Sequence, residues 1–221
     1  MGRTSKAARQ TGLKLLEHDR GLGFRYVAGA DEAGRGCLAG PLVAAAVLFD
    51  FEAIDERSTQ ALLALDDSKR QSPALRAELY PLIMLSAARV VIVSRCAAEI
   101  DRLGLHKSNL ALLREALAGV ARPGCICLSD GFEVAELPYE QRGLIRGDGT
   151  SAAIAAASVI AKETRDRYMR RADQRFPGWA FANHVGYASA EHRAAIERRG
   201  ITPLHRLSFR SAAYQQLRLD Q

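Results

Sequence analysis

Two apolar runs joined by a short, glycine-rich connection constrain this chain more than any other feature. They lie in the stretch VAGADEAGRGCLAGPLVAAAV, residues 27–47. Short apolar runs separated by turn residues predict a hairpin whose strands, residues 24–30 and 42–49, are both largely buried. Asp31 and Glu32 directly follow the first run. Because successive residues of a regular strand point to opposite faces, the two carboxylates can reach one site only if the strand ends or bulges there.

The remaining elements predict a mixed α/β architecture. A β-branched run indicates a third strand at residues 88–96, and another apolar run indicates a fourth at 124–131. Helices are predicted after Ser72 with Pro73 in the first turn, at 107–120 with Ser108 or Asn109 as the N-cap, at 150–176, and from Ser189 to a left-handed cap at Gly200. The first half of the helix at 150–176 is almost entirely small or apolar, so we expect it to lie close against the sheet. This order predicts a mixed central sheet flanked by helices.

Composition and charge indicate one globular domain that meets a polyanion. The 221 residues are 48% hydrophobic and 25% charged, which suits a single domain at residues 21–221 with a short C-terminal helical region. Residues 1–20 hold five basic and two acidic side chains, residues 21–161 hold fourteen and seventeen, and residues 162–221 hold twelve and six. Both ends are therefore basic and the centre is acidic, although such charge runs are also common on solvated helix surfaces. Residues 1–20 form either a basic helix on DNA or a flexible segment.

No export signal or membrane span is expected. The first twenty residues lack the apolar centre of a secretory signal, and no apolar run is long enough to cross a bilayer. We therefore expect a cytoplasmic protein without a membrane partner, and nothing in the sequence demands more than a monomer.

Two further acids stand at the ends of predicted elements. Asp130 ends the fourth apolar run, and Asp148 directly precedes the long helix. Each acid alone has an ordinary explanation, either a solvated turn or a charge that stabilises a helix N-terminus. Four clustered carboxylates would repel one another and raise their own pKa values, so the group predicts a bound cation that prefers oxygen ligands, Mn²⁺ or Mg²⁺.

The chain resembles the type 2 ribonucleases H, and among them the bacterial ribonuclease HII group. The motifs that carry the resemblance run in the family's order from about Phe24 to Phe209: GADEAGRG (29–36), DDSK (66–69), LSDG (128–131), RGDGTSAAIAAASVIAKETRDR (146–167), HVGYASAEH (184–192) and TPLHRLSF (202–209). The resemblance implies a ribonuclease H-like fold and an endonuclease that hydrolyses RNA in RNA/DNA hybrids. It also implies cleavage of duplex DNA on the 5′ side of a single embedded ribonucleotide, which begins ribonucleotide excision repair. Hydrolysis with two metal ions would leave 3′-hydroxyl and 5′-phosphate ends.

The resemblance assigns roles to individual residues. The residues implied to hold the metal ions are Asp31, Glu32, Asp130 and Asp148. The residues implied to contact the substrate are Gly34, Arg35 and Gly36 at the ribose 2′-hydroxyl and its phosphate, Lys69 at a phosphate, and Tyr187 at the sugar of the RNA–DNA junction. The 2′-hydroxyl distinguishes RNA from DNA, and glycines let the backbone approach the sugar closely. On sequence alone Tyr187 could equally be a packing aromatic, and Ser158 and Lys162 could orient carboxylates or bond to other neighbours.

Three positions depart from the family pattern. Cys37 stands where Pro is common, Gln71 where Leu usually follows the DSK motif, and Val185 where Lys would stand in HKGY. We expect the first two to change local packing only. Val185 removes a cation beside Tyr187, and Arg165 or Arg193 could compensate.

Two other functions compete with the nuclease hypothesis. A nucleic-acid-binding module without turnover would bind duplexes in a salt-sensitive manner that is indifferent to metal. A nuclease of different specificity on the same fold, such as a DNA resolvase, would not need the Gly34–Arg35–Gly36 turn.

Overall fold

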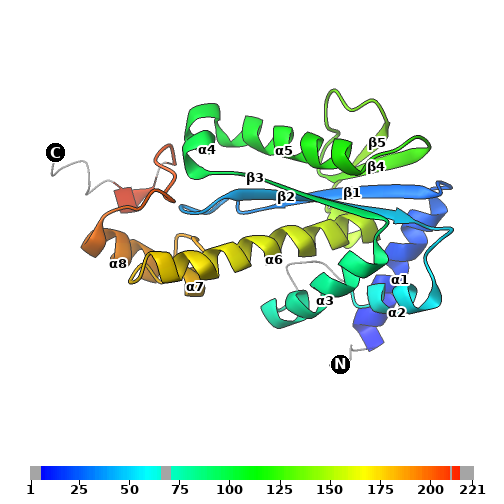
Figure 1. Cartoon of the computed structure of the whole chain (residues 1–221), viewed down its shortest axis with the longest axis horizontal. Coiled ribbons are helices and arrows are strands. Elements are labelled where there is room, and N and C mark those ends of the chain that lie inside the picture. Colours follow the sequence, from blue (N-terminus) through cyan, green and yellow to red (C-terminus); the bar gives the residue numbers. More distant parts are fainter. Residues whose placement is uncertain (1–5, 66–70, 210, 215–221) are drawn as a thin grey trace.

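A mixed five-stranded sheet forms the middle layer of the molecule (Figure 1). The computed structural model describes residues 6–65, 71–209 and 211–214. The strands lie in the order β3-β2-β1-β4-β5. They are β1 (Tyr26–Ala33), β2 (Leu42–Asp50), β3 (Arg89–Arg95), β4 (Cys125–Asp130) and β5 (Glu140–Leu144). Strands β1, β2 and β3 pair antiparallel, whereas β4 pairs parallel with both β1 and β5. The predicted hairpin and the predicted third and fourth strands are confirmed.

Helices cover both faces of the sheet. They are α1 (Lys6–Gly21), α2 (Glu56–Leu62), α3 (Pro73–Ser86), α4 (Ala97–Leu103), α5 (Leu105–Val120), α6 (Ala152–Arg175), α7 (Phe181–His184) and α8 (Ala190–Arg199), with 3₁₀ turns η1 (Gly147–Gly149) and η2 (Ala212–Tyr214). Helix α5 packs on one face and α6 on the other, so the sheet is the centre of three layers (Figure 1). A short C-terminal group, α7, α8 and η2, lies beyond the end of the sheet where α6 finishes (Figure 1).

The close contact between α6 and the sheet follows from its small residues, as predicted. All residues from Ala152 to Ala161 are buried. A Cβ atom added to Gly29 of β1 would lie 2.2 Å from the carbonyl carbon of Ala153. Glycine on the strand and alanine on the helix therefore let the two backbones meet, which fixes α6 against the strand that carries Asp31.

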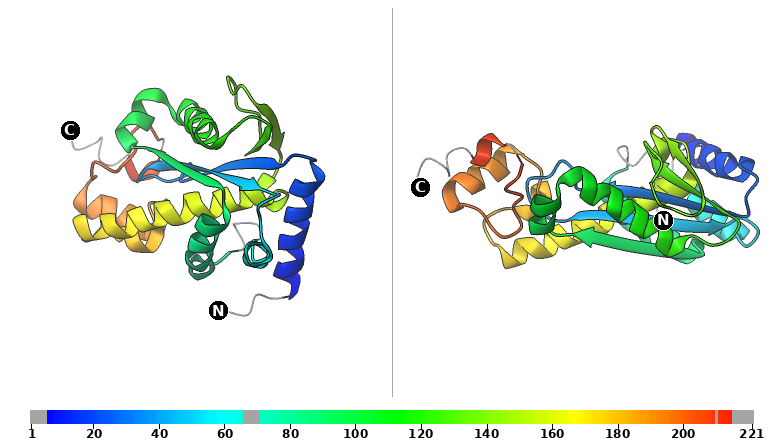
Figure 2. Two further views of the ribbon diagram at one scale, coloured as in Figure 1. Left: turned by 45° about the vertical axis from the view of Figure 1, so that its right-hand side comes forward. Right: turned by 90° about the horizontal axis from the view of Figure 1, so that it is seen from above.

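Helix α1 packs into the same core. Leu15 and Leu16 are buried in the cluster between the sheet and α6. The carboxylate of Asp19, fully buried, accepts hydrogen bonds from the Ser151 hydroxyl at 3.1 Å and from the Ala153 backbone N–H at 2.9 Å. Figure 2 shows α1 at the end of the molecule where α6 begins. Asp19 thus stabilises the first turn of α6, which directly follows Asp148.

Two predicted helix ends are wrong in detail. Helix α5 begins at Leu105 with Gly104 as its N-cap, so Ser108 and Asn109 lie inside the helix and are buried. Gly200 ends α8 with a positive φ of 74°, but its ψ of −149° lies outside the left-handed helical region. The caps after Ser72 and Ser189 are confirmed, because each serine hydroxyl accepts a backbone N–H of the first turn.

Candidate active site

Asp31 and Glu32 lie on β1 just beyond the point where its pairing with β4 ends, although β1 itself continues. Strand β1 remains paired with β2 through Ala33. Its pairing with β4 ends at Ala30, opposite Ser129. Beyond that point β1 has no neighbour on the β4 side within the described residues, so a gap opens between the two strands. The sequence had suggested that β1 itself ends at the acids, and the structure shows that its neighbour ends instead.

Asp130 lies at the end of β4 beside this gap, and Asp148 lies in a turn that is hydrogen-bonded to Asp130. Asp130 is the last residue of β4, as predicted. Asp148 is buried in the turn η1, just before α6. The backbone N–H of Gly147 donates to Oδ1 of Asp130 at 2.7 Å. This bond joins the end of β4 to the turn that carries Asp148, so residues far apart in the chain are brought together.

Asp31 faces α6, where two polar residues support its carboxylate. Burial and, second, repulsion from Glu32 raise the pKa of Asp31 to about 7. A hydrogen bond from Ser158 and the charge of Lys162 oppose this rise. Lys162 Nζ also donates to Ser158 Oγ at 3.0 Å. Ser158 and Lys162, which the sequence left undecided, therefore orient and stabilise this carboxylate.

Glu32 faces α5 on the other side of the sheet. Burial raises its pKa, and repulsion from Asp130 adds to the effect. Arg35 Nη1 lies 3.1 Å from Glu32 Oε1, and this ion pair, together with the nearby polar side chain of Asn109, lowers the pKa of Glu32. Asn109 was predicted as a possible helix cap, so its position near Glu32 was not foreseen from the sequence. A polar residue on the apolar face of a helix was the signal that could have identified it.

The chemistry of the four acids suits a hard divalent cation, but their geometry is not a finished metal site. No three His, Cys, Asp or Glu side chains among the described residues stand close enough to hold one ion. The acids are linked instead in pairs, Asp31 with Glu32 and Glu32 with Asp130. All the donors are carboxylate oxygens, and repulsion that raises carboxylate pKa values is relieved when a cation binds. The residues present therefore fit the predicted Mn²⁺ or Mg²⁺ in their chemistry.

A pocket of about 320 Å³ is lined by two predicted substrate contacts, Gly34 and Tyr187, and by Lys162, whose charge acts on Asp31. Its lining includes Ala33, Gly34, Lys162, Arg165 and Tyr187. Tyr187 is 52% exposed, so it is not a buried packing aromatic. Partial burial, and second the neighbouring Cys37 thiol, raise the pKa of the Tyr187 hydroxyl. The Cys37 thiol therefore lies next to a predicted substrate residue, and the expectation that it changes local packing only stays a prediction.

The Gly34–Arg35–Gly36 turn leads from β1 into this pocket. Gly34 has a φ of +95°, and a Cβ added there would lie 2.2 Å from Arg165 Nε. A Cβ at Gly36 would meet nothing within 4 Å. The Arg35 guanidinium turns back to Glu32, which leaves the backbone of the turn as the part that can face a ligand. Lys69 and the rest of the DDSK motif lie outside the described residues.

Arg165 and Arg193 were expected to supply the cation that Val185 removes, but both already donate hydrogen bonds to backbone carbonyls. Arg165 is 2% exposed and donates to three backbone carbonyls. Arg193 Nη1 donates to the carbonyl of Ala188 at 2.6 Å. Val185 has a φ of 42°, in the left-handed region that β-branched residues rarely adopt. Its side chain lines the pocket next to Tyr187, where the family residue would place a cation.

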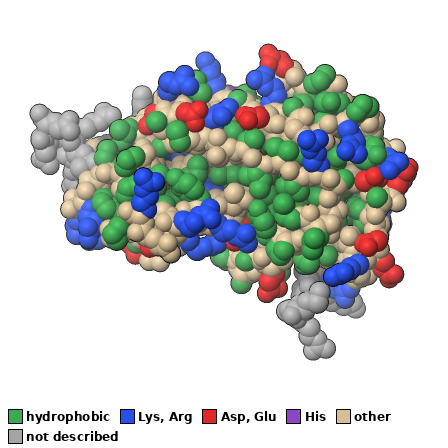
Figure 3. Space-filling view, viewed as in Figure 1, with side chains coloured by type: hydrophobic (Ala, Val, Ile, Leu, Met, Phe, Trp, Pro, Cys, Tyr) green, Lys and Arg blue, Asp and Glu red, His purple; other side chains and the backbone are tan. Residues whose placement is uncertain are grey.

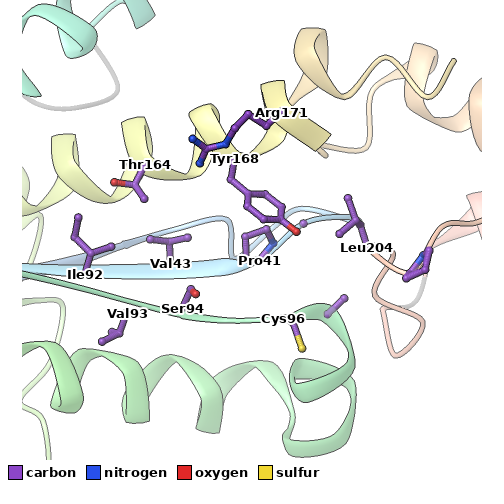
Figure 4. Close-up of a pocket in the computed structure, with 13 residues that line it drawn as sticks. Pro41, Val43, Ile92, Val93, Ser94, Cys96, Thr164, Tyr168, Arg171 and Leu204 are labelled. Carbon is purple, nitrogen blue, oxygen red and sulfur yellow. The ribbon is translucent and has the colours of Figure 1, made fainter. Parts of the chain in front are cut away.

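A second pocket, of about 240 Å³, lies between β3 and the second half of α6 (Figure 4). Its lining is mainly apolar and includes Pro41, Val43, Ile92 and Tyr168. Figure 3 shows the same side of the molecule, with apolar side chains across the centre and basic ones around them. No acid lines this pocket among the described residues, so it is distinct from the carboxylate site.

Comparison with known proteins identifies the family to which this fold and site belong. The family model described as Ribonuclease HII matches residues 28–212. The chain belongs to the ribonuclease HII family. It is 46% identical over 206 residues to a Ribonuclease HII of Salinispora tropica, covering 93% of this chain and 74% of the relative. It is 47% identical over 192 residues to a Ribonuclease HII of Rhizobium johnstonii, covering 86% of this chain and 80% of the relative.

A solved structure supports the same conclusion. The crystal structure of the ribonuclease H2 from Pyrococcus horikoshii OT3 superposes with a TM-score of 0.73 at 25% identity, covering 89% of this chain and 99% of that one. The predicted ribonuclease H-like fold is confirmed. As a ribonuclease HII family member the chain is a ribonuclease H endonuclease, not a binding module without turnover. Among the described helices, none is long and apolar enough to span a membrane.

Proposed function

We propose that this ribonuclease HII hydrolyses RNA in RNA/DNA hybrids and cuts duplex DNA 5′ to a single embedded ribonucleotide. The products would carry 3′-hydroxyl and 5′-phosphate ends, and the reaction would start ribonucleotide excision repair in the cytoplasm. The single observation that carries this proposal is that Lys162, whose charge acts on the buried carboxylate Asp31, lines the same pocket as Gly34 and Tyr187. A phosphodiester in reach of the acids would thus have its sugar in reach of groups that can sense a 2′-hydroxyl.

We propose that Asp31, Glu32, Asp130 and Asp148 are the ligands for Mn²⁺ or Mg²⁺. The bound cations would lower the pKa of an attacking water and stabilise the leaving oxygen. Ser158 and Lys162 keep Asp31 oriented and favour its charged form, while Arg35 and Asn109 do the same for Glu32. The two carboxyls need such partners because burial alone raises their pKa values and so favours the protonated, uncharged form.

Substrate selection is assigned to the turn and the tyrosine. The backbone of Gly34, Arg35 and Gly36 would bind the 2′-hydroxyl and the adjoining phosphate, and Tyr187 would contact the sugar of the next nucleotide. Lys69 would bind a phosphate. A site that hydrogen-bonds a hydroxyl can reject the deoxy analogue by on the order of 10⁴-fold, because its polar groups are otherwise left unpaired. The proposed substrate is bound by a monomer.

Cleavage of an end-labelled DNA duplex with one ribonucleotide tests the proposal. We expect one cut, 5′ to the ribonucleotide, with Mn²⁺ or Mg²⁺ and none with EDTA. Asp31→Asn and Asp130→Asn should abolish cleavage while duplex binding remains. Asp50→Asn is the matched control, since Asp50 also ends a strand but pairs with Arg25 away from the site.

Two results would contradict the proposal. Unchanged turnover in Asp130→Asn would remove the acids from catalysis. Cutting of an all-DNA four-way junction in preference to the ribonucleotide duplex would instead support the resolvase alternative.

A further inference from the structure

Arg165 connects the turn at the active site to the segment that carries Tyr187. Its guanidinium is buried, and no acid pairs with it among the described residues. Nε donates to the carbonyl of Pro41 at 2.9 Å, and Nη2 to that of Ala39 at 2.9 Å. Nη1 donates to the carbonyl of Val185 at 2.8 Å. One side chain thus bonds the loop of residues 34–41, called here the recognition loop, to the residues just before Tyr187.

Arg206 holds the recognition loop from a second side. It is fully buried, and all the hydrogen bonds of its guanidinium in the described structure go to backbone carbonyls of the loop. Nη1 donates to Gly34 at 2.7 Å and to Arg35 at 3.2 Å. Nε and Nη2 donate to Gly40 at 3.0 and 2.8 Å. A rigid, forked guanidinium can satisfy several carbonyls at once, which a lysine ammonium cannot do in the same geometry.

Burial of two cations near each other is costly and therefore points to a specific role. Burial lowers the pKa of Arg206 to about 10, and the charge of Arg165 contributes to the same shift. Three glycines make the arrangement possible: Gly34, Gly40 and Gly186 all have positive φ, and a Cβ at any of them would lie within 3.2 Å of Arg165. The glycines are thus required by the arginine as much as by the turn.

The hydrogen bonds of Arg206 decide which way the recognition loop's peptide groups face. In a planar trans peptide the C=O and the following N–H point in opposite directions. Because the carbonyls of Gly34 and Arg35 point inward to Arg206, the N–H groups of Arg35 and Gly36 point away from it. No hydrogen bond of the described loop residues uses these two N–H groups, and the space beside Gly36 is open.

The segment around Tyr187 is fixed to the same unit. The carbonyl of Gly186 accepts from the N–H groups of Leu38 at 2.9 Å and Ala39 at 3.3 Å. His192 Nδ1 lies 2.8 Å from the carbonyl of Tyr187. The recognition loop and the tyrosine therefore keep one relative position.

The protonation of the histidines follows from their partners. The Thr202 N–H donates to His205 Nδ1, so the proton of neutral His205 is on Nε2 and is shared with His192 Nε2 at 3.2 Å. This leaves the proton of His192 on Nδ1, where it donates to Tyr187.

We propose that Arg165 and Arg206 are positioning residues for ribose recognition. They orient the N–H groups of Arg35 and Gly36 toward the 2′-hydroxyl or its phosphate, and they hold Tyr187 at a fixed distance from these N–H groups. The inference rests on the proposed function and goes beyond it by assigning specificity to two residues that do not touch the substrate.

Binding measured in the inactive Asp130→Asn background tests this role separately from chemistry. Fluorescence anisotropy compares a duplex carrying one ribonucleotide with the same duplex made only of DNA. Arg206→Lys should reduce the preference for the ribonucleotide duplex by about tenfold or more, while affinity for the all-DNA duplex stays within about twofold. Leu113→Ala, a destabilising change in the core on the α5 side, controls for a general loss of stability and should keep the preference.

A double-mutant cycle with Gly36→Ala gives a second readout. If Arg206 acts through the recognition loop, the losses of preference caused by Arg206→Lys and Gly36→Ala should not add. Hydrogen exchange gives a third readout. It uses the Asp130→Asn protein with both arginines intact, so it does not require that an arginine variant folds. There the amides of Arg35 and Gly36 should gain protection with the ribonucleotide duplex and not with the all-DNA duplex.

The possible failures are distinguishable. If the wild type does not cut the ribonucleotide duplex, the proposed function fails. If it cuts and a folded Arg206→Lys keeps the full preference, the positioning inference is overturned and the proposed cleavage stands. If it cuts but the two amides gain no protection, the assignment of the turn to ribose recognition is overturned together with the positioning inference.

Discussion

Alanine at Gly36 and at Gly34 should have opposite consequences, although the two glycines are two residues apart. A Cβ at Gly36 meets nothing within 4 Å, and the φ of Gly36 lies outside the left-handed region. Gly36→Ala should therefore leave the free energy of unfolding unchanged or raise it by about 0.4–1 kcal/mol, since alanine reduces the entropy of the unfolded chain. Gly34 has a φ of +95°, and its Cβ would lie 2.2 Å from Arg165 Nε and 2.8 Å from the Pro41 carbonyl oxygen.

The cost of Gly34→Ala follows from these two facts. A positive φ costs an L-residue about 1–2 kcal/mol, and forcing a methyl group into a packed site costs about 1–3 kcal/mol more. We expect Gly34→Ala to lower the free energy of unfolding by about 2–5 kcal/mol. Gly36→Ala should instead lower kcat/KM on the single-ribonucleotide duplex by about tenfold to 100-fold, the equivalent of one lost hydrogen bond to the substrate.

Urea denaturation and steady-state cleavage by the same preparations distinguish the two variants. We expect Gly36→Ala to unfold at the urea midpoint of the wild type or at a higher urea concentration, while its kcat/KM falls. Wild-type kcat/KM in a folded Gly36→Ala protein would refute the assignment of the turn to substrate recognition. Equal destabilisation by the two substitutions would refute the packing argument.

Three further predictions concern charges at and near the site. Because the pKa of Asp31 is raised from 3.8 to about 7, folded protein without metal retains a proton that unfolded chains release in this window, so its stability falls as pH rises from about 4 to about 7. Asp31→Asn should remove this loss of stability, which is on the order of a few kcal/mol. In urea unfolding with EDTA, the variant should have a higher free energy of unfolding than wild type at pH 8, and the difference should vanish near pH 4. A difference that does not depend on pH would contradict the assignment. Asp19→Ala leaves the Ala153 N–H and the Ser151 hydroxyl without their buried acceptor. Urea unfolding should show a free energy of unfolding lower by about 2–4 kcal/mol, and Asp19→Asn should lower it less. A decrease below about 0.5 kcal/mol in Asp19→Ala would show that α1 does not stabilise α6. Val185→Lys should strengthen binding to any duplex and steepen the salt dependence of binding by about one counterion, measured by anisotropy across a salt series; an unchanged slope would mean that position 185 does not reach a phosphate.

Prediction from sequence succeeded for elements with a strong local pattern. Strands β1, β2 and β4 are apolar and buried, and α6 is marked by its run of small residues. Strand β5 was not predicted because it lies at the edge of the sheet and consists of the largely polar residues EQRGL. An edge strand is held by one neighbour and leaves much of its surface in water, so its sequence needs no apolar run.

The candidate site shows the same division between local and long-range information. Asp31, Glu32, Asp130 and Asp148 were identified because motifs surround them. The structure links Asp31 with Glu32 and Glu32 with Asp130, and it joins Asp130 by a hydrogen bond to the turn that carries Asp148. Asn109 was missed because its contact with Glu32 depends on where α5 begins and how it docks. The opening at Asp31 depends on the point where β4 ends, which no pattern within β1 can indicate.

The sequence by itself determined the strand hairpin, the small-residue helix, the four acids and, through its motifs, the ribonuclease HII family. Tertiary structure alone decided how the recognition loop is held. Arg206 and Gly34 are 172 positions apart, and the partner of the arginine is a backbone carbonyl, which every residue possesses. A hydrogen bond to the backbone leaves no mark on the identity of its acceptor, so only the folded arrangement shows that two buried arginines are bonded to the recognition loop.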